Sequence, residues 1–202
     1  MINNARKYNI AIFASGTGSN FINIFDSINK GVINADISLL ISNNSHCNAV
    51  TFARDNNINC EVINNTRYES KELANVMLEK LVNHKIDLIA LAGYMKKIPH
   101  EVGDYYSDRI LNIHPALLPE FGGKGFFGMK VHEAVIASKA EYTGVTIHIV
   151  DSEYDSGDIV YQEKIKILRH DTASSISKKV LDLEHKAYPG VIENFLENNI
   201  KQ

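Results

Sequence analysis

The chain has 202 residues, of which 45% are hydrophobic and 22% charged, and its formal net charge is −3. This composition is typical of a globular protein and excludes a strongly basic surface for nucleic acid or an anionic membrane. No apolar run reaches the length of a transmembrane helix, and the first eight residues lack a signal-peptide core. Two cysteines are too few for a disulfide scaffold or a zinc site. We therefore expect a cytoplasmic protein that holds no metal and binds neither nucleic acid nor membranes.

The first half of the chain alternates short apolar runs with amphipathic segments. The runs expected to be strands are residues 10–14, 37–41, 60–63, 88–92 and 110–113. Helical spacing of apolar residues falls between them, at residues 20–28, 47–56 and 71–84. Because this alternation is typical of βαβ units, it predicts a parallel sheet with helices on both faces.

After Pro119 the pattern changes. A loop rich in glycine and phenylalanine at 121–128 precedes a short predicted helix at 129–138 and two alternating strands at 144–150 and 158–166. Thr172 is placed to cap a final helix, which Pro189 is expected to end or kink, with a further turn at 191–196. We predict one α/β domain over residues 1–202, with residues 1–8 as a flexible extension. Its mostly parallel, Rossmann-like sheet forms three layers with the helices, and the C-terminal part adds antiparallel strands.

Asn112 and His114 lie two residues apart at the end of a predicted strand, just before Pro115. In an extended backbone such residues point to the same side, so both can donate hydrogen bonds to one oxygen. That arrangement suits stabilisation of an oxyanion during attack on a carbonyl. The alternative is a histidine that only serves the structure, and the sequence alone leaves it open. His132 and His148 are ambiguous between buried and functional positions.

Three other segments carry polar groups after predicted strands. The turn Gly16-Thr17-Gly18 precedes a helix, and it favours an anion such as phosphate, although a plain turn is the alternative. Residues 91–99 offer Tyr94 and Met95 as a pocket wall, or else form a solvated basic turn with Met95 in the core. The acidic loop at 150–158 could orient and charge an imidazole, although most acidic loops are solvated turns.

Four motifs in chain order resemble a known family: SGTGSN at 15–20, LAGYM at 91–95, NIHPALLP at 112–119 and DSEYDSG at 151–157. Together they are similar to the phosphoribosylglycinamide formyltransferases, a branch of the 10-formyltetrahydrofolate formyltransferase group. The likeness runs from about residue 9 to about residue 195. It implies transfer of the formyl group of 10-formyltetrahydrofolate to the amine of 5'-phosphoribosylglycinamide, in purine biosynthesis and without a metal. The implied partners are these small molecules, in a monomer or homodimer.

The resemblance also implies roles for individual residues. Asn112, His114 and Asp155 match the catalytic trio, with Asp155 favouring the charged form of His114. The implied substrate contacts are Gly18, Ser19 and Asn20 for phosphate and Glu184 for ribose. The implied folate contacts are Lys71, Met95, Lys96, Lys97, Ile98 and Asn112, with the backbone of 152–155 beside the pterin.

The sequence departs from the family at several of these positions. Many relatives carry arginine at the positions of Lys71 and Lys96, and lysine lacks the planar fork for a carboxylate. Leu181 stands where some members have a phosphate-contacting lysine, and the loop at 121–130 is longer and richer in glycine.

Other classes remain as alternatives. A formyltetrahydrofolate deformylase would share the trio but usually carries an additional N-terminal domain. A methionyl-tRNA formyltransferase would need an RNA-binding module and a basic surface. A non-enzymatic folate- or nucleotide-binding module would bind both ligands without turnover.

Overall fold

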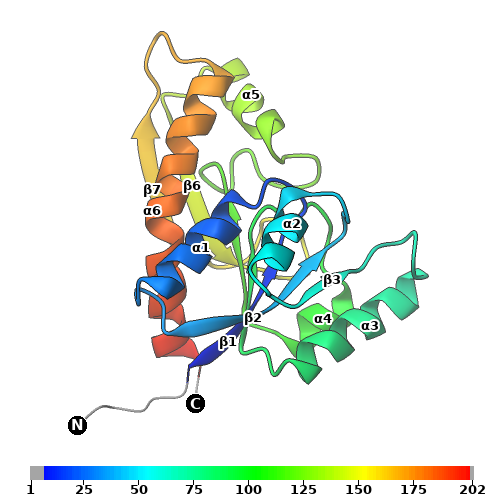
Figure 1. Cartoon of the computed structure of the whole chain (residues 1–202). Helices are drawn as coiled ribbons and strands as arrows, with labels where there is room; N and C mark the ends of the chain where they lie inside the picture. Colours follow the sequence, from blue (N-terminus) through cyan, green and yellow to red (C-terminus); the bar gives the residue numbers. More distant parts are fainter. Residues whose placement is uncertain (1–6, 201–202) are drawn as a thin grey trace.

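A computed structural model describes residues 7–200 and has one seven-stranded sheet, in the order β3-β2-β1-β4-β5-β6-β7 (Figure 1). Strands β1 to β5 are parallel, β6 pairs antiparallel with β5, and β7 pairs antiparallel with β6. The predicted mixed sheet is thereby confirmed. The strands are β1 (Tyr8–Phe13), β2 (Ala35–Ser42), β3 (Cys60–Val62), β4 (Leu88–Leu91), β5 (Ile110–His114), β6 (Tyr142–Ile149) and β7 (Ile159–Lys166).

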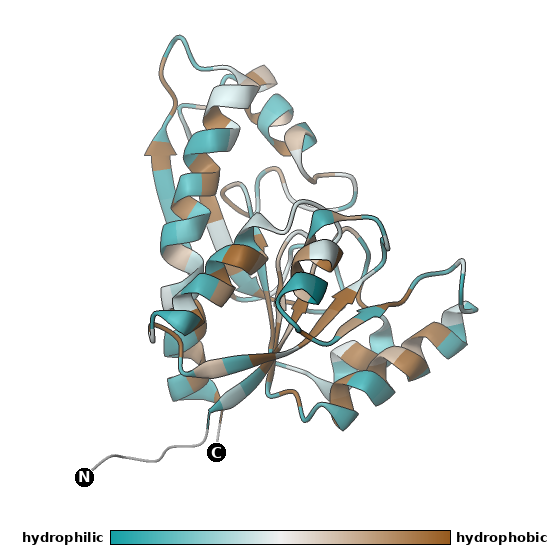
Figure 2. Ribbon diagram, viewed as in Figure 1, coloured by the Kyte–Doolittle hydropathy of each residue, from teal (hydrophilic) through white to brown (hydrophobic). Residues whose placement is uncertain are grey.

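Helices cover both faces of the sheet, as the alternating pattern predicts. In β1, Ile10 and Ile12 join one hydrophobic core while Ala11 and Phe13 join the other. The first core packs against α1 (Ser19–Asn29), α2 (Asn48–Asp55) and α6 (Ala173–Asn199), and the second against α3 (Ser70–Asn83) and α4 (His100–Tyr105). The helix α5 (Met129–Ala137) packs against α6. Figure 2 shows the matching distribution, with hydrophobic residues concentrated along the strands and the inner sides of the helices.

The final helix differs from its prediction. Thr172 caps α6 as expected, in a reciprocal arrangement with Ser175, but the helix continues through Pro189 to Asn199. A proline inside a helix costs about 3 kcal/mol. Each buried large apolar side chain contributes about 1.5–3 kcal/mol, and the turns after Pro189 bury Val191, Ile192, Phe195 and Leu196. This burial outweighs the lost backbone hydrogen bond and keeps the segment helical.

Two smaller differences concern the ends of elements. The strand β1 begins at Tyr8, which pairs with Ala35, so the predicted extension ends before that residue. The rest of that prediction concerns residues 1–6, which lie outside the described residues. The short helix α4 was not predicted, since Val102 is its only buried residue and it has no apolar periodicity. Within residues 7–200, no helix combines the length and apolarity needed to cross a membrane. The single-domain organisation remains a prediction.

The topology brings several loops to one edge of the sheet. The chain leaves β1 for β2 on one side and later returns to β4 on the other side of β1. Loops at the carboxyl ends of these two neighbouring strands therefore diverge and leave a crevice, the usual ligand position in open α/β sheets. The glycine-rich turn follows β1, and the segment from Ala92 follows β4.

Candidate active site

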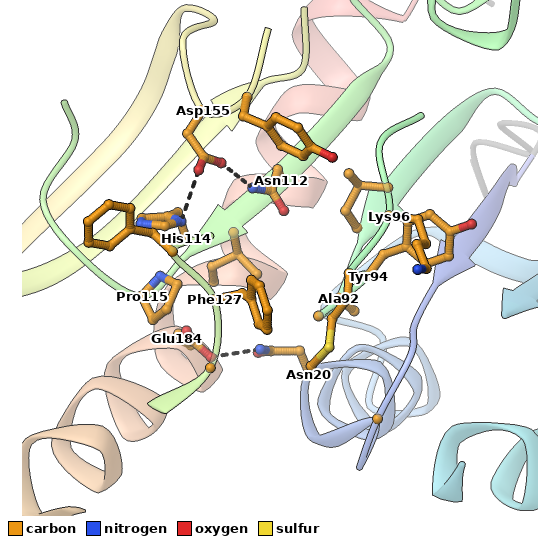
Figure 3. Close-up of a pocket in the computed structure, with 18 of the residues that line it drawn as sticks. Asn20, Ala92, Tyr94, Lys96, Asn112, His114, Pro115, Phe127, Asp155 and Glu184 are labelled. Atoms are coloured by element: carbon orange, nitrogen blue, oxygen red, sulfur yellow. Dashed lines mark hydrogen bonds and ion pairs between the residues drawn. The ribbon is translucent and has the colours of Figure 1, made fainter. Parts of the chain in front are cut away.

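A cavity of about 720 Å³ lies at this edge of the sheet (Figure 3). Its walls come from the turn after β1, the segment after β4, the end of β5, the loop before α5, the β6–β7 connection and one face of α6. Nearly all residues implied by the resemblance line it: Gly18, Ser19, Asn20, Met95, Lys96, Lys97, Ile98, Asn112, His114, Asp155 and Glu184. Lys71 is the exception, because it is exposed at the start of α3 and outside the cavity lining.

Asn112 and His114 both face the cavity, as their spacing on β5 predicts. Asp155 reaches them from the β6–β7 connection. Its Oδ2 lies 3.7 Å from Nδ1 of His114, and its Oδ1 lies 3.4 Å from Nδ2 of Asn112. One carboxylate thus contacts both side chains of the β5 motif.

The loop before α5 holds two members of this trio through its backbone. Nε2 of His114 lies 2.9 Å from the carbonyl oxygen of Phe121 and must donate to it, because a carbonyl only accepts. The amide of Gly123 donates to Oδ2 of Asp155 at 2.8 Å. A neutral His114 therefore carries its hydrogen on Nε2 and presents the lone pair of Nδ1 toward Asp155.

Burial and charge act in opposite directions on the pKa of His114. Burial lowers the pKa of His114 below its ordinary value, although the charge of Asp155 and the Phe121 carbonyl act in the opposite direction. The charge of Asp155 therefore favours the charged imidazole, as the resemblance implies, while burial disfavours it. Burial raises the pKa of Asp155, but the groups in contact with the carboxylate, the Gly123 amide among them, outweigh burial and lower it. The lowered pKa of Asp155 keeps its side chain a carboxylate beside the buried imidazole.

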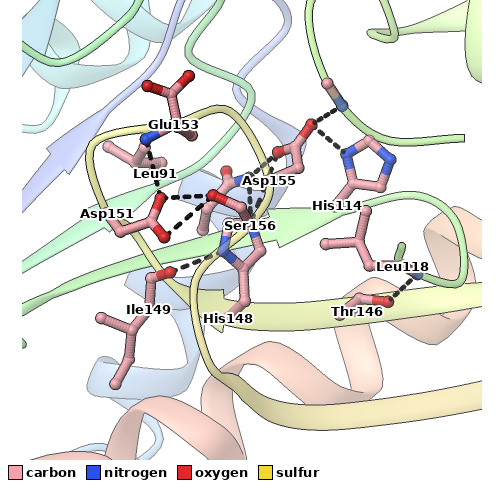
Figure 4. A network of polar contacts seen from close by, with 12 residues as sticks. Leu91, His114, Leu118, Thr146, His148, Ile149, Asp151, Glu153, Asp155 and Ser156 are labelled. Atoms are coloured by element: carbon pink, nitrogen blue, oxygen red, sulfur yellow. Dashed lines mark hydrogen bonds and ion pairs between the residues drawn. The ribbon is translucent and has the colours of Figure 1, made fainter. Parts of the chain in front are cut away.

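His148 also belongs to this cluster, although the sequence left it ambiguous. It lies opposite Asn112 in the antiparallel β5–β6 pairing, and its side chain is buried (Figure 4). Its Nε2 lies 3.1 Å from Nδ2 of Asn112 and 3.5 Å from Oδ1 of Asp155. The strand register that brings it there is a long-range property, so no local pattern could have identified it.

The first turn of α1 forms the far end of the cavity. Gly18 precedes the helix with a φ of 75°, and a Cβ there would lie 2.9 Å from Cβ of Ala49, so both backbone conformation and space require glycine. Among residues 7–200, no side chain caps the helix at Gly18. Its first amides are therefore available to an anion.

Asn20 and Glu184 connect α1 to α6 across this end. Nδ2 of Asn20 donates to Oε2 of Glu184 at 2.7 Å, while Oδ1 of Asn20 is buried with no hydrogen-bond partner in the described chain. Burial raises the pKa of Glu184 to about 7. Leu181 lines the cavity one helical turn before Glu184. The arrangement offers acceptors and unfilled hydrogen-bonding capacity to a polar ligand.

The opposite end of the cavity is more apolar and carries lysines. The ring of Tyr94 packs edge-to-face on Phe13 and forms part of the wall, as predicted. Met95 is 50% exposed, which contradicts the alternative that it lies in the core. Its backbone amide donates to the hydroxyl of Ser15 at 2.9 Å, which ties this segment to the turn after β1. Lys97 lies over the ring of Tyr154 at 5.7 Å.

The loop at 121–130 contributes directly to the cavity. The loop residues from Gly123 to Met129 line the cavity, and His132 in α5 lines it as well. His132 is buried, and its Nδ1 has no hydrogen-bond partner within the described residues. Among residues 7–200, no group of three or more His, Cys, Asp or Glu side chains is placed to hold a metal ion.

The fold and this site define a class of enzyme, and sequence comparison identifies it. Residues 8–192 match the family described as formyl transferase. The chain belongs to this formyl transferase family.

Individual relatives and solved structures agree with this family assignment. The phosphoribosylglycinamide formyltransferase of Bacillus subtilis is 36% identical over 190 residues, covering 94% of this chain and 95% of the relative. The chloroplastic phosphoribosylglycinamide formyltransferase of Vigna unguiculata is 42% identical over 96% of this chain, which spans only 63% of that relative's length. The crystal structure of phosphoribosylglycinamide formyltransferase from Bacillus halodurans superimposes with a TM-score of 0.87 at 33% identity, covering 94% of this chain and 96% of that one.

A solved formyltetrahydrofolate deformylase from Pseudomonas syringae shares the fold at 20% identity and a TM-score of 0.85. This chain spans 64% of it. At that identity the likeness concerns the fold alone.

Proposed function

We propose that the protein transfers the formyl group of 10-formyltetrahydrofolate to the amine of 5'-phosphoribosylglycinamide. The products are 5'-phosphoribosyl-N-formylglycinamide and tetrahydrofolate, in purine biosynthesis. The observation that carries this assignment is the convergence of Asn112, His114 and Asp155 on a cavity with an anion-binding turn at one end. The names of the relatives at 36–42% identity support the same reaction.

The chemistry begins when the amine attacks the formyl carbon. A carbon–nitrogen bond forms, and the carbonyl oxygen becomes an oxyanion that Asn112 and protonated His114 stabilise by donating hydrogen bonds. For this, Nε2–H of His114 exchanges the Phe121 carbonyl, which it contacts in the free site, for the oxyanion. Because burial lowers the pKa of His114, we place its protonation within the reaction, as the attacking amine releases a proton. Asp155 then stabilises the imidazolium across 3.7 Å.

Collapse of the intermediate completes the transfer. The bond between the formyl carbon and N10 of the folate breaks, and the proton lost by the amine reaches the leaving nitrogen, through His114 or an ordered water. The electron pairs and protons balance without an oxidant. The described residues offer no ligand cluster for a metal, and no step requires one.

The amine substrate is placed by the far end of the cavity. The amides of Gly18, Ser19 and Asn20 bind the phosphate at the start of α1, where the helix dipole favours negative charge. Glu184 accepts hydrogen bonds from the ribose hydroxyls. This placement is supported by the uncapped helix and by the contact of Glu184 with Asn20.

The folate occupies the other end. Met95 and Ile98 contact its apolar rings, the backbone at 152–155 borders the pterin, and Lys96 and Lys97 face the carboxylates. Lys71 lies outside the cavity lining at the exposed start of α3, and its folate contact remains a prediction. We further propose a cytoplasmic protein that acts as a monomer or homodimer.

An absorbance assay of tetrahydrofolate release tests the assignment. A transferase releases tetrahydrofolate only when phosphoribosylglycinamide is present, whereas the alternative deformylase releases it with water alone. If the protein binds both ligands but releases no tetrahydrofolate, it is a binding module and not an enzyme.

A further inference from the structure

We propose, on the basis of the proposed formyl transfer, that His148 is a positioning residue that sets the orientation of the Asn112 amide. No role follows for His148 from the family motifs, because it lies outside all four. Both of its Nε2 contacts are to side chains of the proposed catalytic trio.

The tautomer of His148 follows from its other nitrogen. Nδ1 lies 2.8 Å from the backbone carbonyl oxygen of Ile149 (Figure 4). A carbonyl only accepts hydrogen bonds, so the hydrogen of the neutral imidazole is on Nδ1. Nε2 is then unprotonated, and its lone pair accepts hydrogen bonds.

This acceptor selects one of the two orientations of the Asn112 amide. Nε2 of His148 lies 3.1 Å from Nδ2 of Asn112 and takes one of its two hydrogens. Oδ1 of Asp155 lies 3.4 Å from the same nitrogen. An ionised carboxylate is also only an acceptor. A rotated amide would turn its oxygen toward two acceptors, so both neighbours disfavour it.

The two contacts differ in strength, which assigns the larger effect to His148. The Asp155 contact exceeds the ordinary range for an N–H···O hydrogen bond, whereas the His148 contact falls within ordinary hydrogen-bond distance. The developing oxyanion can therefore replace Asp155 at the second hydrogen while His148 keeps the first. Figure 3 shows the amide nitrogen of Asn112 turned toward Asp155 and its oxygen turned away.

The surroundings of His148 keep its ring in place. The side chain is 2% exposed, on a strand paired with both β5 and β7. The charged or titratable groups facing its ring are Asp155 and, across that carboxylate, His114. A leucine could fill the same space, but it would leave Nδ2 of Asn112 with only the long contact to Asp155.

Two variants and one spectrum test the inference. His148→Leu removes the acceptor, and His148→Gln restores one, because the glutamine amide reaches the position of Nε2. Removing an oxyanion donor costs roughly 10²–10³ in rate, and misorienting one is expected to cost less, about 10- to 50-fold in kcat. The KM for both substrates should change little, and His148→Gln should recover most of the rate.

His84→Leu is the matched control. Nδ1 of His84 also lies 2.8 Å from a backbone carbonyl, that of Lys80, but His84 is away from the cavity.

Nitrogen-15 NMR of the wild-type protein gives a readout that does not depend on turnover. Nε2 of His148 should resonate as an unprotonated ring nitrogen, and the Asn112 side-chain amide signals should shift in His148→Leu. A protonated Nε2, a folded His148→Leu with normal kcat, or a His148→Gln as slow as His148→Leu would each overturn the inference. If His148→Leu does not fold, His148→Gln and the wild-type spectrum still decide. Failure of the wild type to transfer formyl groups would overturn the proposed function while leaving the spectrum to judge the amide orientation.

Discussion

Oδ2 of Asp155 accepts a hydrogen bond from the backbone amide of Gly123 at 2.8 Å and lies 3.7 Å from Nδ1 of His114. The carboxylate is thus held by a loop backbone on one side while it faces the buried His114 imidazole on the other. Because burial keeps the pKa of His114 low, Asp155 matters most when the imidazole becomes charged during the reaction. Its contribution should therefore be seen in the rate of the chemical step.

Asp155→Asn tests this role because it keeps the shape of the side chain and removes its charge. We expect kcat to fall by roughly 10²–10³, comparable to the loss of a preorganised electrostatic group, with KM for both substrates nearly unchanged. Asn112→Ala and His114→Ala should show the same separation of kcat from KM. Steady-state kinetics with Asp36→Asn, a surface carboxylate on β2, as control checks the prediction. A variant of the trio with near-normal kcat would contradict its assigned role.

Glu184 should make the stability of the protein depend on pH. Its pKa is about 7 in the folded protein and 4.5 without the fold, so the native state binds the proton more tightly. Stability therefore falls as pH rises from about 4.5 to about 7, and each unit of pKa corresponds to about 1.4 kcal/mol. We expect Glu184→Gln to be more stable than wild type by about 3 kcal/mol at pH 8 and equally stable below pH 4.5.

Urea denaturation of Glu184→Gln and wild type across this range measures the difference, with the surface variant Glu197→Gln as control. The same substitution should raise the KM for phosphoribosylglycinamide, because glutamine is a weaker acceptor for ribose hydroxyls. A constant stability difference between pH 4 and pH 8 would show that Glu184 does not titrate as described.

Gly122 should be required for the loop contacts to the trio. A Cβ at this position would clash with Cδ2 of Leu118 and lie 3.2 Å from Cβ of Asp155. Gly122→Ala should displace the neighbouring Phe121 carbonyl and Gly123 amide and lower kcat about tenfold, a small part of the roughly 10²–10³ for losing a donor outright. Gly103→Ala in α4 is the control, since its Cβ would meet open space. Equal kcat in the two variants would show that the loop does not position His114 and Asp155.

Leu181 should be a position where a cation improves substrate binding. It lines the cavity on the same face of α6 as Glu184, which bonds Asn20 in the first turn of α1. Leu181→Lys should lower the KM for phosphoribosylglycinamide about tenfold or more, because a hydrogen bond to a charged group contributes about 1.5–3 kcal/mol, with little change in the KM for folate. Leu181→Gln, of similar length but uncharged, separates charge from shape. No gain over Leu181→Gln would place the phosphate elsewhere.

The parts of this structure that depend on local patterns were predictable. Period-two alternation placed Asn112 and His114 on one side of β5, and the alternating runs predicted the parallel sheet. The cap at Thr172 followed from its side-chain chemistry. Local sequence could not show that apolar burial carries α6 through Pro189.

The long-range parts were not predictable from spacing. The approach of Asp155 to His114 depends on how the β6–β7 connection folds back, and only the family resemblance suggested it. His148 joined the site through the register of β6 against β5. The lowered pKa of His114 depends on burial by the whole fold. Lys71 matched a motif position but lies outside the cavity.

The most direct test of the central claim is the stoichiometry of the reaction in one vessel. Tetrahydrofolate release is followed by absorbance while mass spectrometry quantifies 5'-phosphoribosyl-N-formylglycinamide. The proposed mechanism predicts one formylated product for each tetrahydrofolate and no release without phosphoribosylglycinamide, with both signals lost together in His114→Ala. Tetrahydrofolate formed with free formate and no formylated product would contradict formyl transfer to the amine.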